Sequence, residues 1–219
     1  MKRKVVAVVP MKLNNRRLPG KNTKKFDNGD PLCCYILNTL KKIPEIDEIF
    51  VYCSNPDVQQ FLPSGVTYLK RSESLDQDTS SINDVLSSFA KDVDSEIYVM
   101  THATSPFVSA ESIRKGLLAV MNDGYDSAFA VKKIQDFLWM NDKPLNYSLD
   151  KIARTQDLPP IFAETSGFYI YKNPIITEMN RRIGNNPLKV EVSDIEAVDI
   201  DEKFDFELAN ILYNNVINR

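Results

Sequence analysis

The apolar run VVAVV at residues 5–9 constrains the fold of this chain more than any other segment. Four of its five residues are β-branched valines, and Pro10 ends the run. A short, uninterrupted apolar run of this kind is typical of a strand that is buried on both faces of a parallel sheet. Because both faces of such a strand must be covered by helices, the run predicts an α/β domain.

The rest of the chain alternates between apolar runs and amphipathic segments of about ten residues. Strands that alternate with helices in this way form βαβ units, so we predict a doubly wound, mostly parallel sheet. We expect strands at 46–53, 66–69, 96–100, 127–131 and 168–171, and helices at 31–40, 58–62, 82–93, 111–121 and 204–217.

The alternation lapses between residues 132 and 163. This stretch contains the only tryptophan, Trp139, and two polar turns that contain proline, at 141–144 and 157–160. A structureless loop of this length is uncommon inside a compact domain. We therefore expect residues 1–219 to form a single domain with a small insert or lid at about 132–163. Hairpin strands in the insert would pack on the core or on a second subunit.

Composition limits the chemistry and the partners. The 27 Lys and Arg residues are balanced by 30 Asp and Glu residues, and no basic run is present, which argues against a nucleic-acid partner.

No apolar run approaches the roughly 20 residues of a membrane span, and residues 5–9 are too few for a signal-peptide core. We therefore expect no membrane association and a cytoplasmic location. A single histidine and three cysteines without a C-x-x-C motif disfavour a zinc site or a disulfide framework.

A cationic loop follows the first predicted strand. Lys12, Arg16, Arg17 and Lys21 lie within ten positions of one another. Ligands of open α/β sheets bind at the carboxyl ends of the strands, and four cations at that place suit a polyphosphate. A solvated loop with incidental charge is the alternative, because the loop has neither the P-loop nor the dinucleotide-binding glycine pattern.

Two aspartates near the C-terminal end form a second candidate site. Asp199 and Asp201 are separated by one residue, and on an extended segment both carboxylates would point to the same side. Two carboxylates on one side can share a magnesium ion. The alternative is that Asp201 caps the helix predicted to begin near residue 204.

Two further loops carry small polar residues where predicted strands end. His102 and Thr104 follow the strand at 96–100, and Arg71 precedes Ser80 and Ser81 in another loop. Loops at such positions often bind ligands. The alternative for the hydroxyl residues is capping of the helices that follow them, and a lone histidine is more often a structural hydrogen-bonding residue than a base.

Six short motifs, in order, resemble those of the acylneuraminate (CMP-sialic acid) cytidylyltransferase family. The first starts at Val9 and ends in LPGKN at residues 18–22. The others are HATSP at 102–106, GYDS at 124–127, RTQD at 154–157, SGFY at 166–169, and DID at 199–201 with a further aspartate at 205. The resemblance spans residues 5–209. It implies a Rossmann-like nucleotidyltransferase fold and transfer of CMP from CTP to an acidic keto-sugar of the sialic-acid type, with release of pyrophosphate and with Mg²⁺ as cofactor.

The resemblance also implies roles for individual residues. Lys21 and Arg16 would hold the triphosphate and act with Asp201 in catalysis, and Asp199 and Asp201 would coordinate magnesium. The implied nucleotide-binding residues are Lys12, Asn22, Arg71 and either Ser80 or Ser81. The implied sugar-binding residues are His102, Thr104, Lys132 or Lys133, Arg154 and Gln156. A homodimer formed through the insert is expected from the family and from the insert's aromatic residues, Phe137, Trp139 and Tyr147.

The chain departs from the family pattern at four places. Lys12 stands where the family has arginine, Leu-Asn-Asn at 13–15 replaces Gly-Gly-Ser, His102 replaces glutamine, and Thr-Ser at 165–166 replaces Asn-Gly. Lysine presents a point charge where arginine presents a fork, and the loop without glycine approaches phosphate less freely. These departures leave open a different acceptor such as Kdo, and a relative that binds the nucleotide or sugar nucleotide without turnover.

Overall fold

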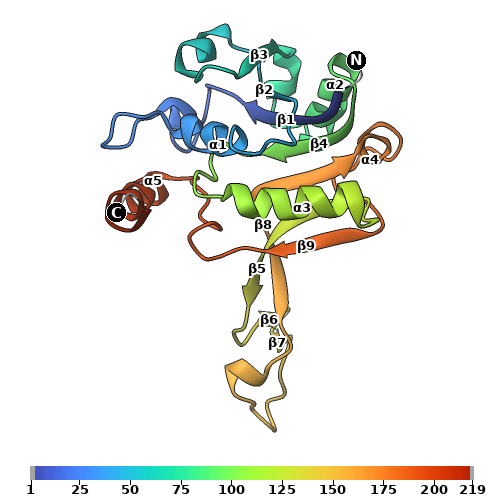
Figure 1. The fold of residues 1–219 in the computed structure, drawn as a ribbon. Coiled ribbons are helices and arrows are strands. Elements are labelled where there is room, and N and C mark those ends of the chain that lie inside the picture. The colour runs from blue at the N-terminus through green and yellow to red at the C-terminus, as the bar shows by residue number, and fades with distance from the viewer. Residues whose placement is uncertain (1–2, 218–219) are drawn as a thin grey trace.

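The computed structural model describes residues 3–217 and consists of a seven-stranded sheet between helices (Figure 1). The strand order is β3-β2-β1-β4-β8-β5-β9. All neighbouring strands are parallel except at β8, which is antiparallel to both β4 and β5. The strands of the sheet are β1 (Arg3–Met11), β2 (Glu48–Cys53), β3 (Thr67–Lys70), β4 (Ser95–Thr101), β5 (Ser127–Ile134), β8 (Ile161–Lys172) and β9 (Pro187–Glu191), and the α-helices are α1 (Leu32–Leu40), α2 (Ile82–Asp92), α3 (Ala110–Asn122), α4 (Asn173–Thr177) and α5 (Lys203–Leu212). The predicted doubly wound, mostly parallel fold is confirmed.

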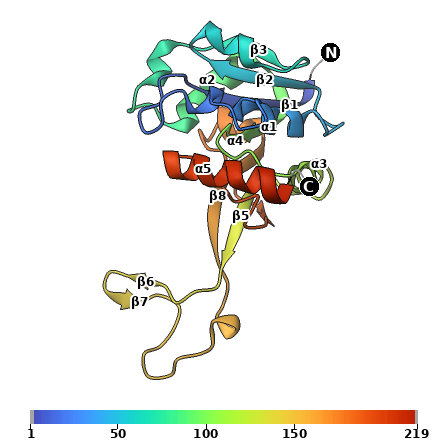
Figure 2. The same cartoon turned by 90° about the vertical axis from the view of Figure 1, so that its left-hand side faces the viewer.

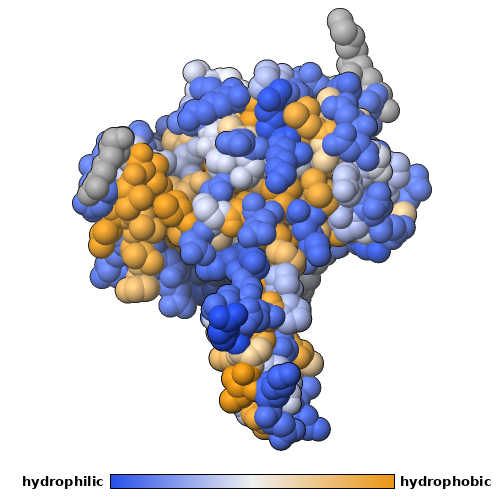
Figure 3. Space-filling model, turned by 60° about the horizontal axis from the view of Figure 1, so that its bottom comes forward, coloured by the Kyte–Doolittle hydropathy of each residue, from blue (hydrophilic) through white to orange (hydrophobic). Residues whose placement is uncertain are grey.

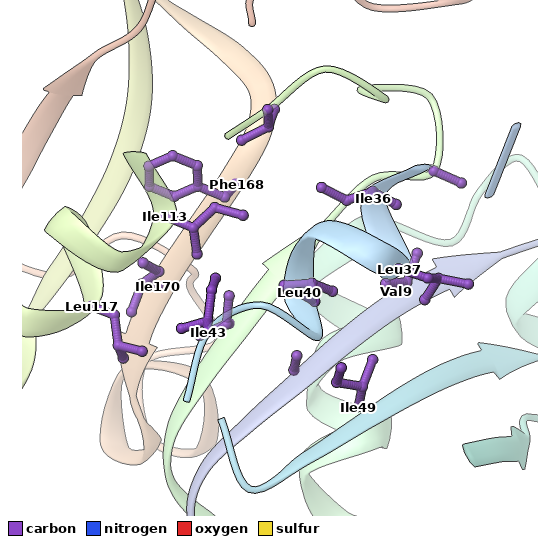
Figure 4. Packing of buried hydrophobic residues seen from close by; sticks show 14 of the residues in the cluster. Val9, Ile36, Leu37, Leu40, Ile43, Ile49, Ile113, Leu117, Phe168 and Ile170 are labelled. Atoms are coloured by element: carbon purple, nitrogen blue, oxygen red, sulfur yellow. The ribbon is translucent and has the colours of Figure 1, made fainter. Parts of the chain in front are cut away.

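Alternate side chains of β1 enter two separate hydrophobic cores. Val5, Ala7 and Val9 pack with residues of α1 and α3, as Figure 4 shows for Val9 and its neighbours. Val6 and Val8 pack with residues of α2 and α4 on the other face. All five side chains are fully buried, and burial of each valine contributes about 1.5–3 kcal/mol. The uninterrupted apolar run thus reflects a strand covered on both faces.

Several elements differ from the sequence-based expectations. The segment expected as a helix at 58–62 is a 3-10 helix, Pro56–Phe61, and the C-terminal helix gives way to a π-helical turn, Tyr213–Ile217. The strand expected at 168–171 is the end of a twelve-residue strand, β8. The sequence pattern does not predict the edge strand β9, because Val190 is its only buried residue and the strand therefore lacks an apolar run.

Residues 135–160 project from the body as an arm (Figures 1 and 2). The strands β5 and β8 continue to pair up to Ile134 and Ile161, at the base of this arm. The arm contains the expected hairpin strands, β6 (Trp139–Met140) and β7 (Lys143–Pro144), and a 3-10 turn at Thr155–Asp157.

Topology brings the ends of β1, β4 and β5 to one edge of the sheet. These three strands point in the same direction, and β8 starts at the edge where they end. The arm therefore emerges beside the loops that follow β1 and β4, and those loops contain the cationic and hydroxyl residues described above. Within residues 3–217, no helix has the length and apolar character needed to cross a membrane.

Candidate active site

A polar cavity of about 360 Å³ lies at this edge of the sheet. Its walls come from the loop after β1, the loop after β4, the interior of β8 and the segment before α5. This is the place where open α/β sheets bind ligands. The cavity is lined by Pro10, Lys12, Asn15, Arg17, Lys21, Asn22, His102, Ala103, Thr104, Ser166, Asp199 and Asp201.

Lys21 ties the cationic loop to the acidic segment. Gly20 adopts a left-handed conformation, with φ 66°, which lets the chain turn into the 3-10 helix that contains Lys21. The buried Lys21 Nζ donates to the carbonyl oxygen of Ile200, at 2.8 Å, and to Asp201 Oδ1, at 3.0 Å. A buried ammonium group requires such partners. The structure thus brings together two of the residues expected to act in catalysis.

Asp201 is ionised between two cations. Arg17 Nη2 donates to the same Asp201 Oδ1 at 2.7 Å. Burial raises the pKa of the Asp201 carboxyl, but the hydrogen bond and charge of Lys21, together with Arg17, outweigh it and hold the pKa below its usual value. A carboxylate in this state can attract a metal ion or exchange one cation for another.

One carboxylate oxygen of Asp199 is buried and has no hydrogen-bond partner. Its Oδ2 accepts a hydrogen bond from Ser166 Oγ at 2.8 Å, whereas Oδ1 is buried without a hydrogen-bond partner. Asn15 and Asn22 line the same cavity, and the Oδ1 atom of each is also buried without a hydrogen-bond partner. Buried oxygens without partners are uncommon and costly.

The carboxylate groups of Asp199 and Asp201 fit a magnesium ion. Mg²⁺ in nucleotide sites usually takes one or two carboxylates and completes its shell with water and phosphate oxygens. Asp199 and Asp201 supply that number. In the part of the chain that the structure describes, no group of three or more His, Cys, Asp or Glu side chains is arranged to hold a metal ion. Water and phosphate oxygens would therefore have to complete the shell of a bound magnesium ion.

The cap of α5 is formed by residues other than Asp201. Asp205 Oδ2 accepts hydrogen bonds from the backbone N–H groups of Asp201, at 3.0 Å, and Glu202, at 2.8 Å, and Glu202 is the N-cap. The alternative that Asp201 serves as the helix cap is therefore wrong. Because Asp205 takes over capping, the Asp201 carboxylate remains available to the cavity.

His102 lies between this cavity and a smaller one of about 230 Å³, and it lines both. Burial lowers the pKa of His102 to about 4; Asp199 opposes this effect, while Arg182 and Lys21 reinforce it. The imidazole is therefore neutral at pH 7, and it can donate or accept a hydrogen bond but cannot pair with an anion as a cation. Thr104 also lines the larger cavity, and its carbonyl oxygen accepts from the Ile200 N–H at 2.9 Å.

The smaller cavity combines apolar walls with a few polar groups. Arg71 and Ser80 line it, whereas the Ser81 hydroxyl donates to Asp84 in the capping box at the start of α2. Mostly apolar walls with a few placed polar groups are typical of small-molecule sites. The full lining is Pro10, Met11, Lys12, Arg71, Leu75, Gln77, Ser80, Ile82, Val85 and His102.

Lys12 lies between the two cavities, whereas Arg16, expected to act in catalysis, lines neither of them and is exposed beside the loop before α2. Arg16 forms an ion pair with Asp78, and Lys12 Nζ lies 3.9 Å from Asp78 Oδ1. Lys12 also lines both cavities, and its carbonyl oxygen accepts from Asn22 Nδ2 at 3.1 Å. Each loop cation expected to bind phosphate therefore has a carboxylate partner in the protein, and a triphosphate could replace that partner.

Four residues expected to bind the sugar lie outside the cavity. Lys132 forms a 2.8 Å ion pair with Asp194, and Lys133 is exposed on β5. Arg154 and Gln156 are exposed on the arm, where Arg154 pairs with Asp157. The 12 residues that line the cavity include none of these four.

Three polar residues that line the cavity have no role assigned by the family motifs. Arg17 is one of the four loop cations, but the family motifs assign it no role. Asn15 and Ser166 lie where the motifs depart from the family pattern, so motif comparison cannot identify them. The signal for Arg17 was the local charge density of the loop.

Comparisons with known proteins show the family of the chain. A model of the cytidylyltransferase family matches residues 6–217. An N-acylneuraminate cytidylyltransferase of Oncorhynchus mykiss is 26% identical over 95% of this chain, which spans only 50% of the trout protein. A CMP-N,N'-diacetyllegionaminic acid synthase of Legionella pneumophila is 29% identical over 95% of this chain and 96% of its own length.

Solved structures show the same fold. A CMP:2-keto-3-deoxy-manno-octonic acid synthetase complexed with CTP superposes with a TM-score of 0.71 at 16% identity, over 96% of this chain and 98% of its own. A 4-diphosphocytidyl-2C-methyl-D-erythritol synthase from Anaerococcus prevotii has a TM-score of 0.71 at 14% identity, over 97% of each chain. Because the family match extends over nearly the whole sequence, the protein belongs to the cytidylyltransferase family of nucleotidyltransferase enzymes.

Proposed function

We propose that the protein transfers CMP from CTP to a keto-acid sugar of the nonulosonic type and releases pyrophosphate. The observation that carries this proposal is the contact of Lys21 with Asp201, which joins the cationic loop to the pair of carboxylates in one cavity. The trout and Legionella relatives are named for such acidic sugars, and a structural neighbour is complexed with CTP.

The nucleotide would extend across the two cavities. Its triphosphate would lie against Lys12, Arg16 and Lys21, whose carboxylate partners it would replace. Its base would enter the smaller cavity, beside Arg71 and Ser80. Charge-assisted hydrogen bonds to phosphate oxygens are among the strongest that a protein can form, so this exchange favours nucleotide binding.

A magnesium ion would be held by Asp199 and Asp201, with the unpartnered Asp199 Oδ1 as the strongest sign of it. When bound, magnesium would polarise the α-phosphoryl oxygen and offset the charge of the triphosphate. When magnesium and the triphosphate bind, Arg17 would leave Asp201 and pair with a phosphate oxygen.

The chain's own residues would align the substrates and neutralise charge. The anomeric hydroxyl of the sugar would attack the α-phosphorus in line with the departing pyrophosphate. Most of the acceleration would come from alignment and from cations placed where negative charge develops. Lys21 and Arg16 would stabilise the departing pyrophosphate. His102, being neutral, would hydrogen-bond a sugar hydroxyl, while Thr104 offers a second polar contact.

The arm supports a homodimer. Apolar side chains gather on it (Figure 3), and Trp139 is 57% and Ile152 64% exposed. Large exposed apolar side chains in one segment are typical of an interaction surface. A second copy of the chain would cover them and could bring Arg154 and Gln156 to the cavity of its partner. In such a dimer, these two sugar-binding candidates would lie outside the cavity of their own chain, as they do in this structure.

The test is pyrophosphate release from CTP and magnesium with a panel of nonulosonic acids and Kdo. We expect release with at least one nonulosonic acid and little with UTP. Release with Kdo alone would redirect the proposal to that sugar. CTP binding by calorimetry without release for any sugar would favour a binding protein, and the absence of both would reject the proposal.

A further inference from the structure

A buried ion pair lies beside the proposed nucleotide site. Arg71 Nε and Nη2 both donate to Asp76 Oδ1, at 3.2 Å and 2.5 Å. The other carboxylate oxygen, Oδ2, accepts from Ser54 Oγ at 2.6 Å. The side chains of Arg71 and Asp76 are only 4% and 16% exposed. Both oxygens of Asp76 are therefore occupied, and the orientation of the guanidinium group is fixed.

The two residues of the pair line different cavities. Arg71 lines the cavity of about 230 Å³ in which we place the base. Asp76 and Ser54 line a different cavity, of about 630 Å³. Asp76 binds the guanidinium group through Nε and Nη2, and we assign the donors on Nη1 to a ligand in the cavity that Arg71 lines. Arg71 is also held by its backbone, since its N–H donates to the carbonyl oxygen of Cys53 at 3.2 Å.

We propose that Asp76 is a positioning residue that fixes Arg71 to select cytosine over uracil. The proposal rests on the proposed function and names what sets its base specificity. Cytosine offers two neighbouring acceptors, O2 and N3, whereas N3 of uracil carries a hydrogen. A fixed donor aimed at N3 rejects uracil, because two donors would face each other without a partner. A guanidinium group free to turn could instead meet O2 or O4 of uracil.

The phosphate contacts are separate from this effect. Lys12 Nζ contacts the backbone carbonyl oxygen of Asp76, at 3.5 Å, and not its carboxylate. Changing the Asp76 side chain therefore leaves that contact in place. A positioning role predicts a change in binding and selection of the nucleotide, with little change in kcat once the correct nucleotide is bound.

The test compares Asp76→Asn, Asp76→Glu and Ser54→Ala with a matched control, Glu45→Gln. Glu45 is also 16% exposed and accepts from Arg114 Nη2 at 2.6 Å, and neither residue lines either of the two cavities. The ratio of kcat/KM for CTP to that for UTP, and the binding of each nucleotide by calorimetry, are measured for all four. Thermal unfolding confirms that each variant is folded.

We expect Asp76→Asn to lower the CTP preference by about tenfold, mainly through KM. Asp76→Glu should retain more of the preference, Ser54→Ala should shift it in the same direction by less, and Glu45→Gln should leave it unchanged. If Asp76→Asn does not fold, the result for Ser54→Ala decides. Folded Asp76 and Ser54 variants that keep the wild-type preference for CTP would overturn this inference but not the proposed function. An equal shift of the CTP preference in Glu45→Gln would do the same. A wild-type protein that binds neither nucleotide would overturn the proposed function as well.

Discussion

Lys21 Nζ lies 3.0 Å from Asp201 Oδ1, and this contact joins two segments that are 180 residues apart in the sequence. The cationic loop after β1 and the acidic segment before α5 therefore form one site. A net charge of −3 over the whole chain conceals this arrangement. The opposite charges are separated along the sequence but adjacent in the fold, as a site for a triphosphate and a divalent cation requires.

Replacing Lys21 with Met should weaken CTP binding by about 10- to 150-fold, since a hydrogen bond to a charged group contributes about 1.5–3 kcal/mol. Calorimetry with CTP checks this prediction. Lys25→Met, which removes an exposed cation from the same segment, is the control. Equal affinities of the Lys21 variant and the wild type would contradict a role for Lys21 in phosphate binding.

Replacing Arg17 with Gln should have opposite effects on the metal and on the nucleotide. Arg17 occupies Asp201 Oδ1 in the free protein, so its loss should tighten the binding of Mn²⁺ in the absence of nucleotide. It should also weaken CTP binding, because one phosphate partner is gone. Electron paramagnetic resonance of Mn²⁺ measures the first effect and calorimetry the second.

Arg16→Gln is the matched control for that experiment, since Arg16 pairs with Asp78 and not with Asp201. It should weaken CTP binding without tightening Mn²⁺ binding. Unchanged Mn²⁺ affinity in the Arg17 variant would mean that Asp201 is not a metal ligand or that Arg17 does not compete for it.

Protein stability should fall as the pH drops from about 6.5 to about 4. Burial lowers the pKa of His102 from 6.5 to about 4, so in this window the unfolded chain binds a proton that the folded protein does not. Stability therefore rises with pH across the window and is independent of His102 above it. Urea unfolding at several pH values measures the slope. His102→Gln should have a smaller slope, and an unchanged slope would show that other groups cause it.

The substitution Trp139→Asp should weaken the proposed dimer. It places a charge among the exposed apolar side chains of the arm, and a charge loses hydration when a partner covers it. Light scattering coupled to size-exclusion chromatography measures the mass. Lys151→Asp, at an exposed charged position of the same arm, should leave the mass unchanged. A monomeric wild-type protein would contradict the dimer proposal directly.

Local patterns were sufficient for the elements that are buried on both faces. The run at residues 5–9 predicts β1 because every residue of it is in a core. The edge strand β9 lacks this signal, because one buried residue makes no pattern. The antiparallel direction of β8 could not be predicted either, since a buried strand has the same apolar pattern in both directions.

The site was predictable in its charges but not in its contacts. The loop cations and the pair Asp199 and Asp201 follow from spacing and motifs, and the structure gathers three of the four cations and both aspartates in one cavity. Capping by Asp205 was not predicted, because Asp199, Asp201 and Asp205 lie close together and their spacing alone does not decide which of them caps α5. The buried pair of Arg71 and Asp76 was missed for a similar reason, because a single aspartate in a polar loop resembles any solvated residue.

The most direct test of the account is transfer of the α-phosphate of CTP to a sugar acid. The protein is incubated with CTP labelled at the α-phosphate, magnesium and a nonulosonic acid, and the products are separated. The account predicts that the label enters a CMP-sugar in amounts equal to the pyrophosphate released, and that Asp201→Asn abolishes the transfer. Label that remains in CTP with every nonulosonic acid, or an Asp201→Asn variant of full activity, would contradict it.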